Sequence, residues 1–405
     1  MRQSVFCLLL LVTVLLLAPL PAAGWSIYID YWLDSSPVVG FDGTIFAVGA
    51  VAGGVGGKIH ALNPDGTKKW EFQSGSQITT SPAVSDDEII LFGTLSGCIG
   101  LNNNGKLHNV FDTDEPVKGS PAIDSKGNTY FVTTDPQMQF GTIYCVNPEG
   151  VILWTHLRLS VFSPVLDETN GIVYIAGEDG YLTSYNTTDG STRWNVRVEE
   201  PISGMSVGPD GTVSLHTHIR AAVFLVSVTP WGTRIVVQIP PFRPENPAGR
   251  PGPERNAQGE GASSPVIDMD GTFYFGNGNK FYAFTRSGVK KWDYTAGGEI
   301  KSTAAIGADG IIYFGSADGR INMLNRSGTL VGWFDAGSAI QGSPTLAPNG
   351  MLYFGAADGK LYGLETGSPG LAKSAWPMYM HDPRHTGPAA KRIALPFLNL
   401  LLSGN

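Results

Sequence analysis

The chain has 405 residues, of which 42% are hydrophobic and 15% charged, with a formal net charge of −8. This charge argues against a protein that wraps a nucleic-acid backbone, because such a protein needs clustered cations. The 52 glycines and 27 prolines predict many turns. Their share stays below the roughly 25–30% that is typical of disordered chains, so the composition indicates a folded, turn-rich protein.

Residues 1–24 have the composition of a signal peptide. An apolar segment of about a dozen residues follows Arg2, which is too short to span a bilayer. The small residues Ala22 and Gly24 predict cleavage after Gly24, with an uncleaved anchor as the alternative. We therefore expect export to the periplasm or the medium, and no membrane span in the mature chain.

One pattern recurs eight times along residues 25–375. It consists of Ser-Pro, two apolar residues, an Asp-Gly or Asn-Gly turn, and an apolar strand that ends in glycine. The copies begin at Ser36, Ser81, Ser120, Ser163, Gly204, Ser264, Thr303 and Ser343. Glycine accepts positive φ and so favours tight turns between strands. A spacing of about 40 residues is the period of a four-stranded propeller blade.

Each copy continues with a third and a fourth strand, and the fourth strand often carries tryptophan. These residues are Trp70, Trp154, Trp194 and Trp292, with Trp333 displaced by one position. Trp25 lies 11 residues before Ser36, as Trp70 lies before Ser81. Residues 25–34 should therefore complete the last blade. The predicted fold is an all-β, eight-bladed propeller of four-stranded antiparallel blades, closed by the N-terminal strand; a seven-bladed ring with one stray repeat is the alternative.

The loop elaborations of the repeat should gather on one face. If the strands of a blade are called A to D, the B–C loops and the D–A connections share a face, because antiparallel strands alternate in direction. The long B–C loops, the segment 216–220 and the Pro-rich insertion 239–261 all fall there. Elaborated loops on a rigid scaffold often bind partners, although long surface insertions are also tolerated without a function. The candidate partner-binding residues are Arg243, Arg250 and Arg255 of the insertion, with His216, His218 and Arg220.

Motifs for catalysis are weak in this sequence. Residues 204–208 match G-x-S-x-G, but no helix follows, as a nucleophile elbow requires. His216 and His218 could contact a metal only with a third ligand. Cys98 and Cys145 remain after signal cleavage, and two buried thiols are expected rather than a disulfide framework. The sequence therefore predicts no enzyme.

The C-terminal residues 376–405 form a separate segment after the repeats. His381, Asp382 and His385 are a candidate metal cluster. The alternative is a structural latch in which Trp376 and Met378 are buried and Asp382 caps a turn. The apolar tail 393–402 is too short to span a bilayer and is expected to dock on the propeller or to touch a partner or membrane.

The chain resembles the pyrroloquinoline-quinone-like, or quinoprotein-type, family of β-propeller repeat proteins. The resemblance is carried by the strand–turn–strand pattern of residues 313–321 with the outer-strand tryptophan. It is also carried by residues 376–387, which are similar to a Trp-Pro-Met…His-Thr-Gly element beside such propellers in secreted bacterial proteins. The family includes dehydrogenases and an outer-membrane assembly scaffold. The adjacent cysteine pair of the dehydrogenases and the lipid-anchor cysteine of the scaffold have no counterpart here.

These observations predict a monomeric, non-catalytic, extracytoplasmic propeller that binds a protein or another component of the cell envelope. No cofactor and no metal are expected; pyrroloquinoline quinone with calcium would be implied only by the dehydrogenase resemblance. The alternatives are a quinone-dependent dehydrogenase-like enzyme and a sugar-binding propeller.

Overall fold

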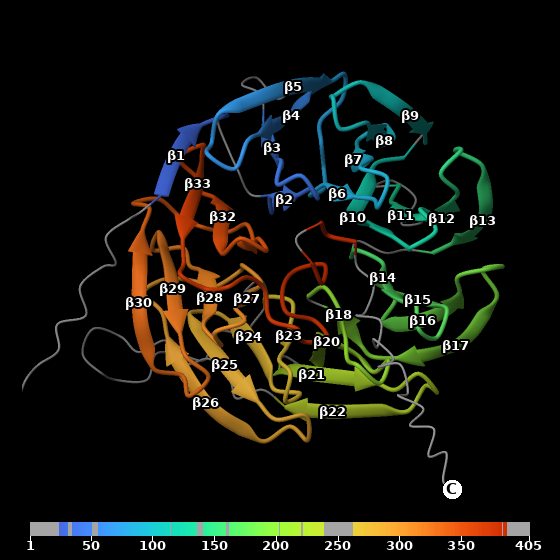
Figure 1. Cartoon of the computed structure of the whole chain (residues 1–405). Coiled ribbons are helices and arrows are strands. Elements are labelled where there is room, and N and C mark those ends of the chain that lie inside the picture. The colour runs from blue at the N-terminus through green and yellow to red at the C-terminus, as the bar shows by residue number, and fades with distance from the viewer. Residues whose placement is uncertain are drawn as a thin grey trace, which may run out of the picture.

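The computed structural model describes residues 24–30, 35–50, 56–113, 115–135, 141–158, 162–201, 203–219, 222–238, 262–382 and 384–386. These residues form eight antiparallel sheets arranged around a central axis (Figure 1). None of the described residues forms a helix. The prediction of an eight-bladed all-β propeller is confirmed, and the seven-bladed alternative is wrong.

The first four blades follow one another along the chain, each running from an inner strand A to an outer strand D. Blade 1 contains β2 (Val38–Val39), β3 (Ile45–Ala50), β4 (Gly57–Leu62) and β5 (Lys68–Ser74). Blade 2 contains β6 (Ala83–Val84), β7 (Ile90–Thr94), β8 (Gly97–Leu101) and β9 (Leu107–Asp112). Blade 3 contains β10 (Val117–Ile123), β11 (Thr129–Thr133), β12 (Thr142–Val146) and β13 (Ile152–Leu157). Blade 4 contains β14 (Val165–Asp167), β15 (Ile172–Ala176), β16 (Tyr181–Asn186) and β17 (Thr192–Arg197).

The remaining blades repeat the plan with two variations. Blade 5 contains β18 (Glu200–Pro201), β19 (Ser206–Val207), β20 (Val213–Ile219), β21 (Ala222–Val228) and β22 (Arg234–Gln238). Blade 6 contains β23 (Val266–Ile267), β24 (Phe273–Asn277), β25 (Lys280–Phe284) and β26 (Lys290–Thr295). Blade 7 contains β27 (Ala305–Ile306), β28 (Ile312–Gly315), β29 (Arg320–Leu324) and β30 (Leu330–Asp335). Blade 8 contains β31 (Thr345–Leu346), β32 (Met351–Gly355) and β33 (Lys360–Glu365), with β1 (Gly24–Tyr28) as its outer strand.

The hydrophobic core lies between neighbouring blades. Successive side chains of a strand point to opposite faces of a sheet, so an adjacent aromatic pair supplies both interfaces of its blade. Tyr313 and Phe314 of β28 are both buried, with exposed fractions of 1% and 0%. Phe314 stacks on Phe281 of blade 6, with ring centroids 4.0 Å apart. The Tyr-Phe pairs of blades 6, 7 and 8 therefore contribute to the core on both sides of their blades.

The recurrent Ser of the Ser-Pro pattern joins the inner strands. The Ser36 N–H donates to Ser81 Oγ of blade 2 at 3.0 Å, and the Ser120 N–H donates to Ser163 Oγ of blade 4 at 2.8 Å. The Ser343 N–H donates to Ser36 Oγ at 3.0 Å, across the joint between the last and the first blade. A small hydroxyl side chain at this position thus pairs a backbone group that would otherwise be buried without a partner.

The outer-strand tryptophans form a second set of contacts between blades. Trp70 Nε1 donates to the carbonyl of Asn103 in the C–D turn of blade 2, at 2.8 Å. Trp25 makes the same bond to Pro64 of blade 1, at 2.9 Å. Gly66 of that turn has φ +85°, and a Cβ there would lie 2.7 Å from the Trp25 ring. Only glycine accepts both the conformation and the approach of the ring.

The N-terminal strand closes the ring as predicted. Strand β1 pairs with β33 in antiparallel register, with Trp25 opposite Gly363 (Figure 1). Just beyond β1, Asp30 accepts a hydrogen bond from His60 Nε2 on β4, at 3.2 Å. The last blade is thereby completed by the first strand of the chain, and its joint uses the same tryptophan contact as the outer strands of blades 1, 3, 4 and 6. Residues 1–23 of the predicted signal peptide lie outside the described residues.

Candidate functional site

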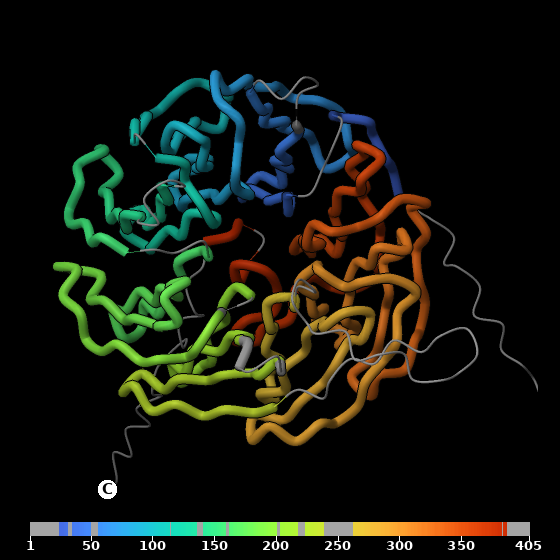
Figure 2. The backbone as a smooth tube through the Cα atoms, turned by 180° about the vertical axis from the view of Figure 1, so that it is seen from behind, coloured from blue at the N-terminus to red at the C-terminus, as the bar shows by residue number. Residues whose placement is uncertain are grey.

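The two ends of the propeller channel differ. Strand A of each blade runs from the end where the B–C and D–A connections lie toward the end where the A–B and C–D turns lie. We call the first end the open face and the second the latch face. The latch is defined as residues 376–382 and 384–386, which lie in the middle of the ring (Figures 1 and 2).

Backbone hydrogen bonds fix the latch to the last residues of four inner strands. The N–H of Ile267 donates to the Trp376 carbonyl, and the N–H of Ile306 donates to the Pro377 carbonyl, both at 2.8 Å. On the other side of the ring, the N–H of Val84 donates to the Arg384 carbonyl at 2.8 Å. The fourth bond runs from the Ile123 N–H to the Thr386 carbonyl, also at 2.8 Å. Blades 2, 3, 6 and 7 are thus tied together at one mouth of the channel.

The side chains of the latch are buried against the blades. Trp376 and Met378 expose 1% and 0% of their surface. Asp382 accepts the N–H of Arg384 at 2.9 Å and the hydroxyl of Thr386 at 2.8 Å, so its carboxylate caps the turn. The contacts match the expectation of a structural latch for these residues.

The two histidines of the latch are enclosed by neighbouring groups. His385 Nδ1–H donates to the Pro82 carbonyl at 3.0 Å, and burial lowers the pKa of His385 to about 4. His381 packs against the Trp376 ring, with centroids 5.4 Å apart, and burial lowers its pKa as well. Over the described ranges, no three His, Cys, Asp or Glu side chains gather as a metal site.

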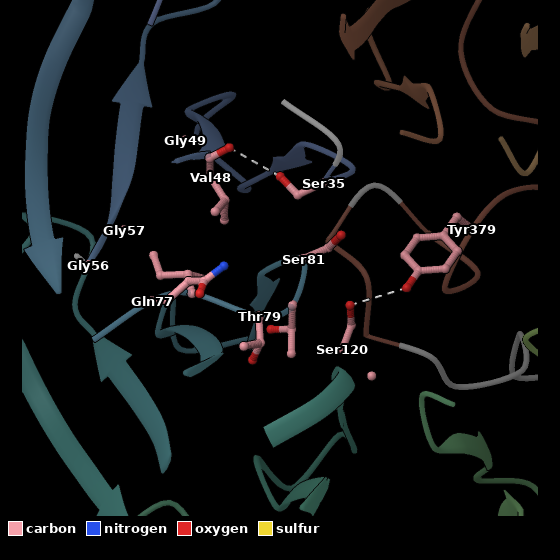
Figure 3. Close-up of a pocket in the computed structure, with 13 residues that line it drawn as sticks. Ser35, Val48, Gly49, Gly56, Gly57, Gln77, Thr79, Ser81, Ser120 and Tyr379 are labelled. Carbon is pink, nitrogen blue, oxygen red and sulfur yellow. Dashed lines mark hydrogen bonds between the residues drawn. The ribbon is translucent and has the colours of Figure 1, made fainter. Parts of the chain in front are cut away.

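A cavity of about 590 Å³ opens at the other mouth (Figure 3). Its wall comes from the D–A connection 77–81, the B–C residues Gly49 and Gly57 of blade 1, and Ser120 of blade 3. Tyr379 of the latch forms part of the wall, with its hydroxyl 3.2 Å from Ser120 Oγ. The latch therefore extends into the channel, and Tyr379 bounds the cavity on the side of the latch face.

A smaller cavity of about 170 Å³ lies on the other side of Tyr379. Its wall contains Ser163, Gly204 and Ser264, from the starts of the inner strands of blades 4, 5 and 6. The Tyr379 hydroxyl also lies 3.4 Å from Ser163 Oγ. Tyr379 thus divides the channel into two compartments with hydroxyl-bearing walls.

His216 is buried inside blade 5 and does not lie in a loop. Strand β20 continues through residues 216–219, opposite β21, because β-branched and aromatic residues on both strands favour pairing. The His216 Nδ1–H donates to the Ser263 carbonyl at 3.1 Å, and the His216 N–H donates to Ser203 Oγ at 3.0 Å. Complete burial lowers the pKa of His216 to about 3. A neutral, enclosed ring offers no surface contact to a partner.

The remaining predicted site residues can be placed only by their position along the chain. His218 pairs with Val223 in the β20–β21 register. Arg220, Arg243, Arg250 and Arg255 lie outside the described residues. The insertion 239–261 connects β22, the outer strand of blade 5, to the inner strand of blade 6, as the sequence predicts for a D–A connection. Of the six predicted residues, the structure therefore describes only His216 and the backbone of His218.

The chemistry of the cavity walls does not fit the cofactor of the dehydrogenases. Pyrroloquinoline quinone carries carboxylates, and calcium prefers carboxylate ligands. The described residues that line the two channel cavities include no Lys, Arg, Asp or Glu. Cys98 and Cys145 are free and buried, as expected, and burial raises the pKa of both thiols to about 12.

The G-x-S-x-G match is a structural feature of blade 5. Ser206 lies in the two-residue strand β19 and has an exposed fraction of 0%. Strand β20 follows it in place of the helix of a nucleophile elbow. The cavity with Tyr379 was not predicted, although the repeated Ser at the start of each inner strand is the signal that points to a hydroxyl-lined channel.

Comparison with known proteins finds similarity to β-propellers of the pyrroloquinoline-quinone-like type. Residues 100–225 match the family described as outer membrane protein assembly factor BamB. Over 126 residues the chain is 29% identical to the BamB of Nitrosomonas eutropha. That match covers 31% of this chain and 27% of the relative, so it spans about a quarter of the relative's length.

Solved structures share the fold over most of the chain. The crystal structure of BamB from Moraxella catarrhalis has a TM-score of 0.62 at 19% identity, over 85% of this chain and 97% of that chain. A europium-containing methanol dehydrogenase has a TM-score of 0.66 at 14% identity, over 82% and 84% of the two chains. The quinohemoprotein alcohol dehydrogenase from Comamonas testosteroni has a TM-score of 0.66 at 12% identity, over 87% and 77%. These likenesses establish the fold. No helix within the described ranges has the length and apolarity needed to cross a membrane.

Proposed function

We propose that this protein is a non-catalytic, extracytoplasmic propeller that binds a protein of the cell envelope through its open face. The observation that carries the proposal is the difference between the two ends of the channel. One end is closed by the latch through backbone bonds to four blades. The other end carries the cavity and the longest insertion of the repeat array.

The comparisons support a scaffold over an enzyme. The sequence match to an outer-membrane assembly factor extends from β8 to β21 and so includes most of blades 3 to 5. The likeness to dehydrogenases is in fold alone, and the described residues that line the two channel cavities carry no charged groups for a quinone and its metal. By analogy with the assembly factor, the partner would be a protein component of an envelope assembly machinery, and the location would be the periplasm.

Exposed apolar residues on the latch face favour a competing surface. Phe41 and Met269 in A–B turns are 63% and 69% exposed, and Trp231 in a C–D turn is 87% exposed. Single exposed apolar residues are common on soluble proteins and do not by themselves mark an interface. The open face is preferred because its loops depart from the repeat, whereas the latch face keeps the regular turns.

The experiment is cross-linked affinity capture from cell envelopes with the full chain as bait. One variant replaces residues 243–255 with a Gly/Ser segment of equal length. The matched control changes Lys291 on the outer strand of blade 6 to alanine, because the three arginines and two glutamates of residues 243–255 also amount to a net charge of +1. The proposal predicts a partner that is lost with the first variant and kept with the control; capture that is unchanged by the first variant removes the insertion from the interface.

A further inference from the structure

The cavity at the open mouth has the dimensions of a ligand site. Its volume of about 590 Å³ falls within the range of about 300–1,000 Å³ that is usual for small-molecule pockets. The latch is bonded to four inner strands at the opposite mouth, so among the described residues the open face gives the approach to the cavity. Tyr379 supplies an aromatic ring to the wall and is neither fully buried nor fully exposed.

The described wall is uncharged and combines hydroxyl groups with apolar side chains such as Val48 and Ile78. Thr79 Oγ1 donates to the Val117 carbonyl at 2.6 Å, and Ser35 Oγ donates to the Val48 carbonyl at 3.3 Å, which leaves their lone pairs as acceptors. Ser81 Oγ accepts the Ser36 N–H, which leaves its own proton for donation. The same wall therefore offers both hydrogen-bond donors and acceptors without a net charge.

This chemistry selects among ligand classes. An anion would need cations, and a metal ion would need carboxylates, and the described lining has neither. An extended peptide would need unpaired backbone groups to bind as a strand. Around the cavity these groups are already used, since the N–H of Gly57 donates to Ser74 Oγ and the N–H of Thr79 donates to the Gly93 carbonyl. The hydroxyls of a neutral sugar can both donate and accept, and they match a wall of hydroxyls.

We propose that the open-mouth cavity of the channel binds a neutral saccharide, with Tyr379 packing against the sugar ring and the hydroxyls of Ser35, Thr79 and Ser81 bonding to its hydroxyl groups. The site lies inside the channel, whereas the proposed protein partner would contact the loops around it. The two activities are separable and can fail independently.

The test is calorimetry and saturation-transfer NMR on the full chain with maltose, cellobiose and diacetylchitobiose as neutral probes. Sialyllactose serves as the anionic comparator and trialanine as the peptide comparator. Gln77, which is exposed at the rim of the cavity, is changed to Trp to fill the mouth. Gln73→Trp is the matched control, because Gln73 is equally an exposed glutamine but lies on β5 outside the cavity.

The proposal predicts saturable binding of at least one neutral probe, weakened about tenfold or more by Gln77→Trp and unchanged by Gln73→Trp. Tyr379→Leu should weaken the same binding, with circular dichroism and the melting temperature reporting whether the latch is intact. Three results would overturn the proposal: no binding of any neutral probe at millimolar concentration, binding that Gln77→Trp leaves intact, or a preference for trialanine or sialyllactose. None of these outcomes depends on capture of a protein partner.

Discussion

The two mouths of the channel are built from the same eight inner strands, yet they are completed differently. At the latch face, the last N–H groups of four inner strands are bonded to the carbonyls of residues 376–386. At the open face, the first residues of the inner strands are bonded to one another through serine hydroxyls, and a cavity remains. In a repeat array, one end of the axis can thus be fixed by an added segment, while the other end keeps a cavity that is available for binding.

The largest effect should come from removing the buried ring of the latch. Trp376→Ala deletes a side chain with 1% exposure that packs in the core of blades 4 to 6. The expected loss is about 3–5 kcal/mol in the free energy of unfolding, because the cavity left behind collapses only in part. Urea denaturation measures it. Trp231→Ala is the control, since a tryptophan that is 87% exposed should change stability by less than about 0.5 kcal/mol.

The joint between blades 8 and 1 should be the next most sensitive place. Trp25→Ala removes the hydrogen bond to Pro64 and the packing of the ring on Tyr353, whose centroid lies 5.9 Å away. We expect a loss of about 2 kcal/mol. Hydrogen exchange should show faster opening of β33 than of the inner strands. Equal protection of β33 in both proteins would contradict the account of ring closure.

Two buried histidines, His385 in the latch and His216 in blade 5, should make the free energy of unfolding depend on pH. The pKa of His385 is lowered from 6.5 to about 4 and that of His216 from 6.5 to about 3. Between these values and 6.5 each of these histidines binds more protons in the unfolded chain than in the folded chain, so their contribution to stability falls as the pH falls below 6.5 and is constant above it. His385→Gln should lower the slope of the free energy of unfolding against pH by up to the value for one proton, about 1.4 kcal/mol per pH unit. An unchanged slope in denaturation measured between pH 4.5 and 6.5 would contradict the neutral state of His385.

The smallest effect should come from the surface of the latch. Arg384 forms an ion pair with Asp86 and lies 4.1 Å from the centroid of the Phe41 ring. Arg384→Ala should cost about 1 kcal/mol or less, because the pair is partly solvated. Added salt should reduce this cost further. A cost as large as that of Trp376→Ala would mean that charge, rather than burial, fixes the latch.

The fold could be predicted from the sequence because the recurring residues of the repeat mark where each strand and turn lies. Asp-Gly turns, Tyr-Phe strands and outer tryptophans recur with one spacing, and Trp25 has the phase of an outer strand before Ser36. The latch could be anticipated in part, since Trp376 and Met378 are large apolar residues in a short segment. Periodicity predicted the fold, and the two large apolar side chains indicated that this segment is buried, because both inferences depend on the local sequence.

The cavity could not be predicted in the same way. The cavity depends on the position of Tyr379 inside the channel. That position is set by backbone bonds from Ile306 and Val84 to the latch, and both residues are far from the latch in the sequence. The burial of His216 was not predicted for a related reason. His216 lies 13 residues after Ser203, and its N–H donates to the hydroxyl of that serine. In blades 6 and 7 the same contact is made by glycines: Gly276 bonds to Ser263, and Gly315 bonds to Ser302. Nothing in a His-x-His pattern reveals this register.

Site-specific photo-cross-linking tests the central claim, that recognition takes place at the open face, most directly. A benzophenone side chain would be placed at Leu95, which is 44% exposed in the B–C turn of blade 2, and in a second protein at Met269, 69% exposed in an A–B turn. The Leu95 N–H donates to the Gln77 carbonyl at the rim of the cavity, so this position reports on the open face. The account predicts an adduct with an envelope protein from Leu95 and none from Met269. An adduct from Met269 alone would contradict it and make the latch face the interface.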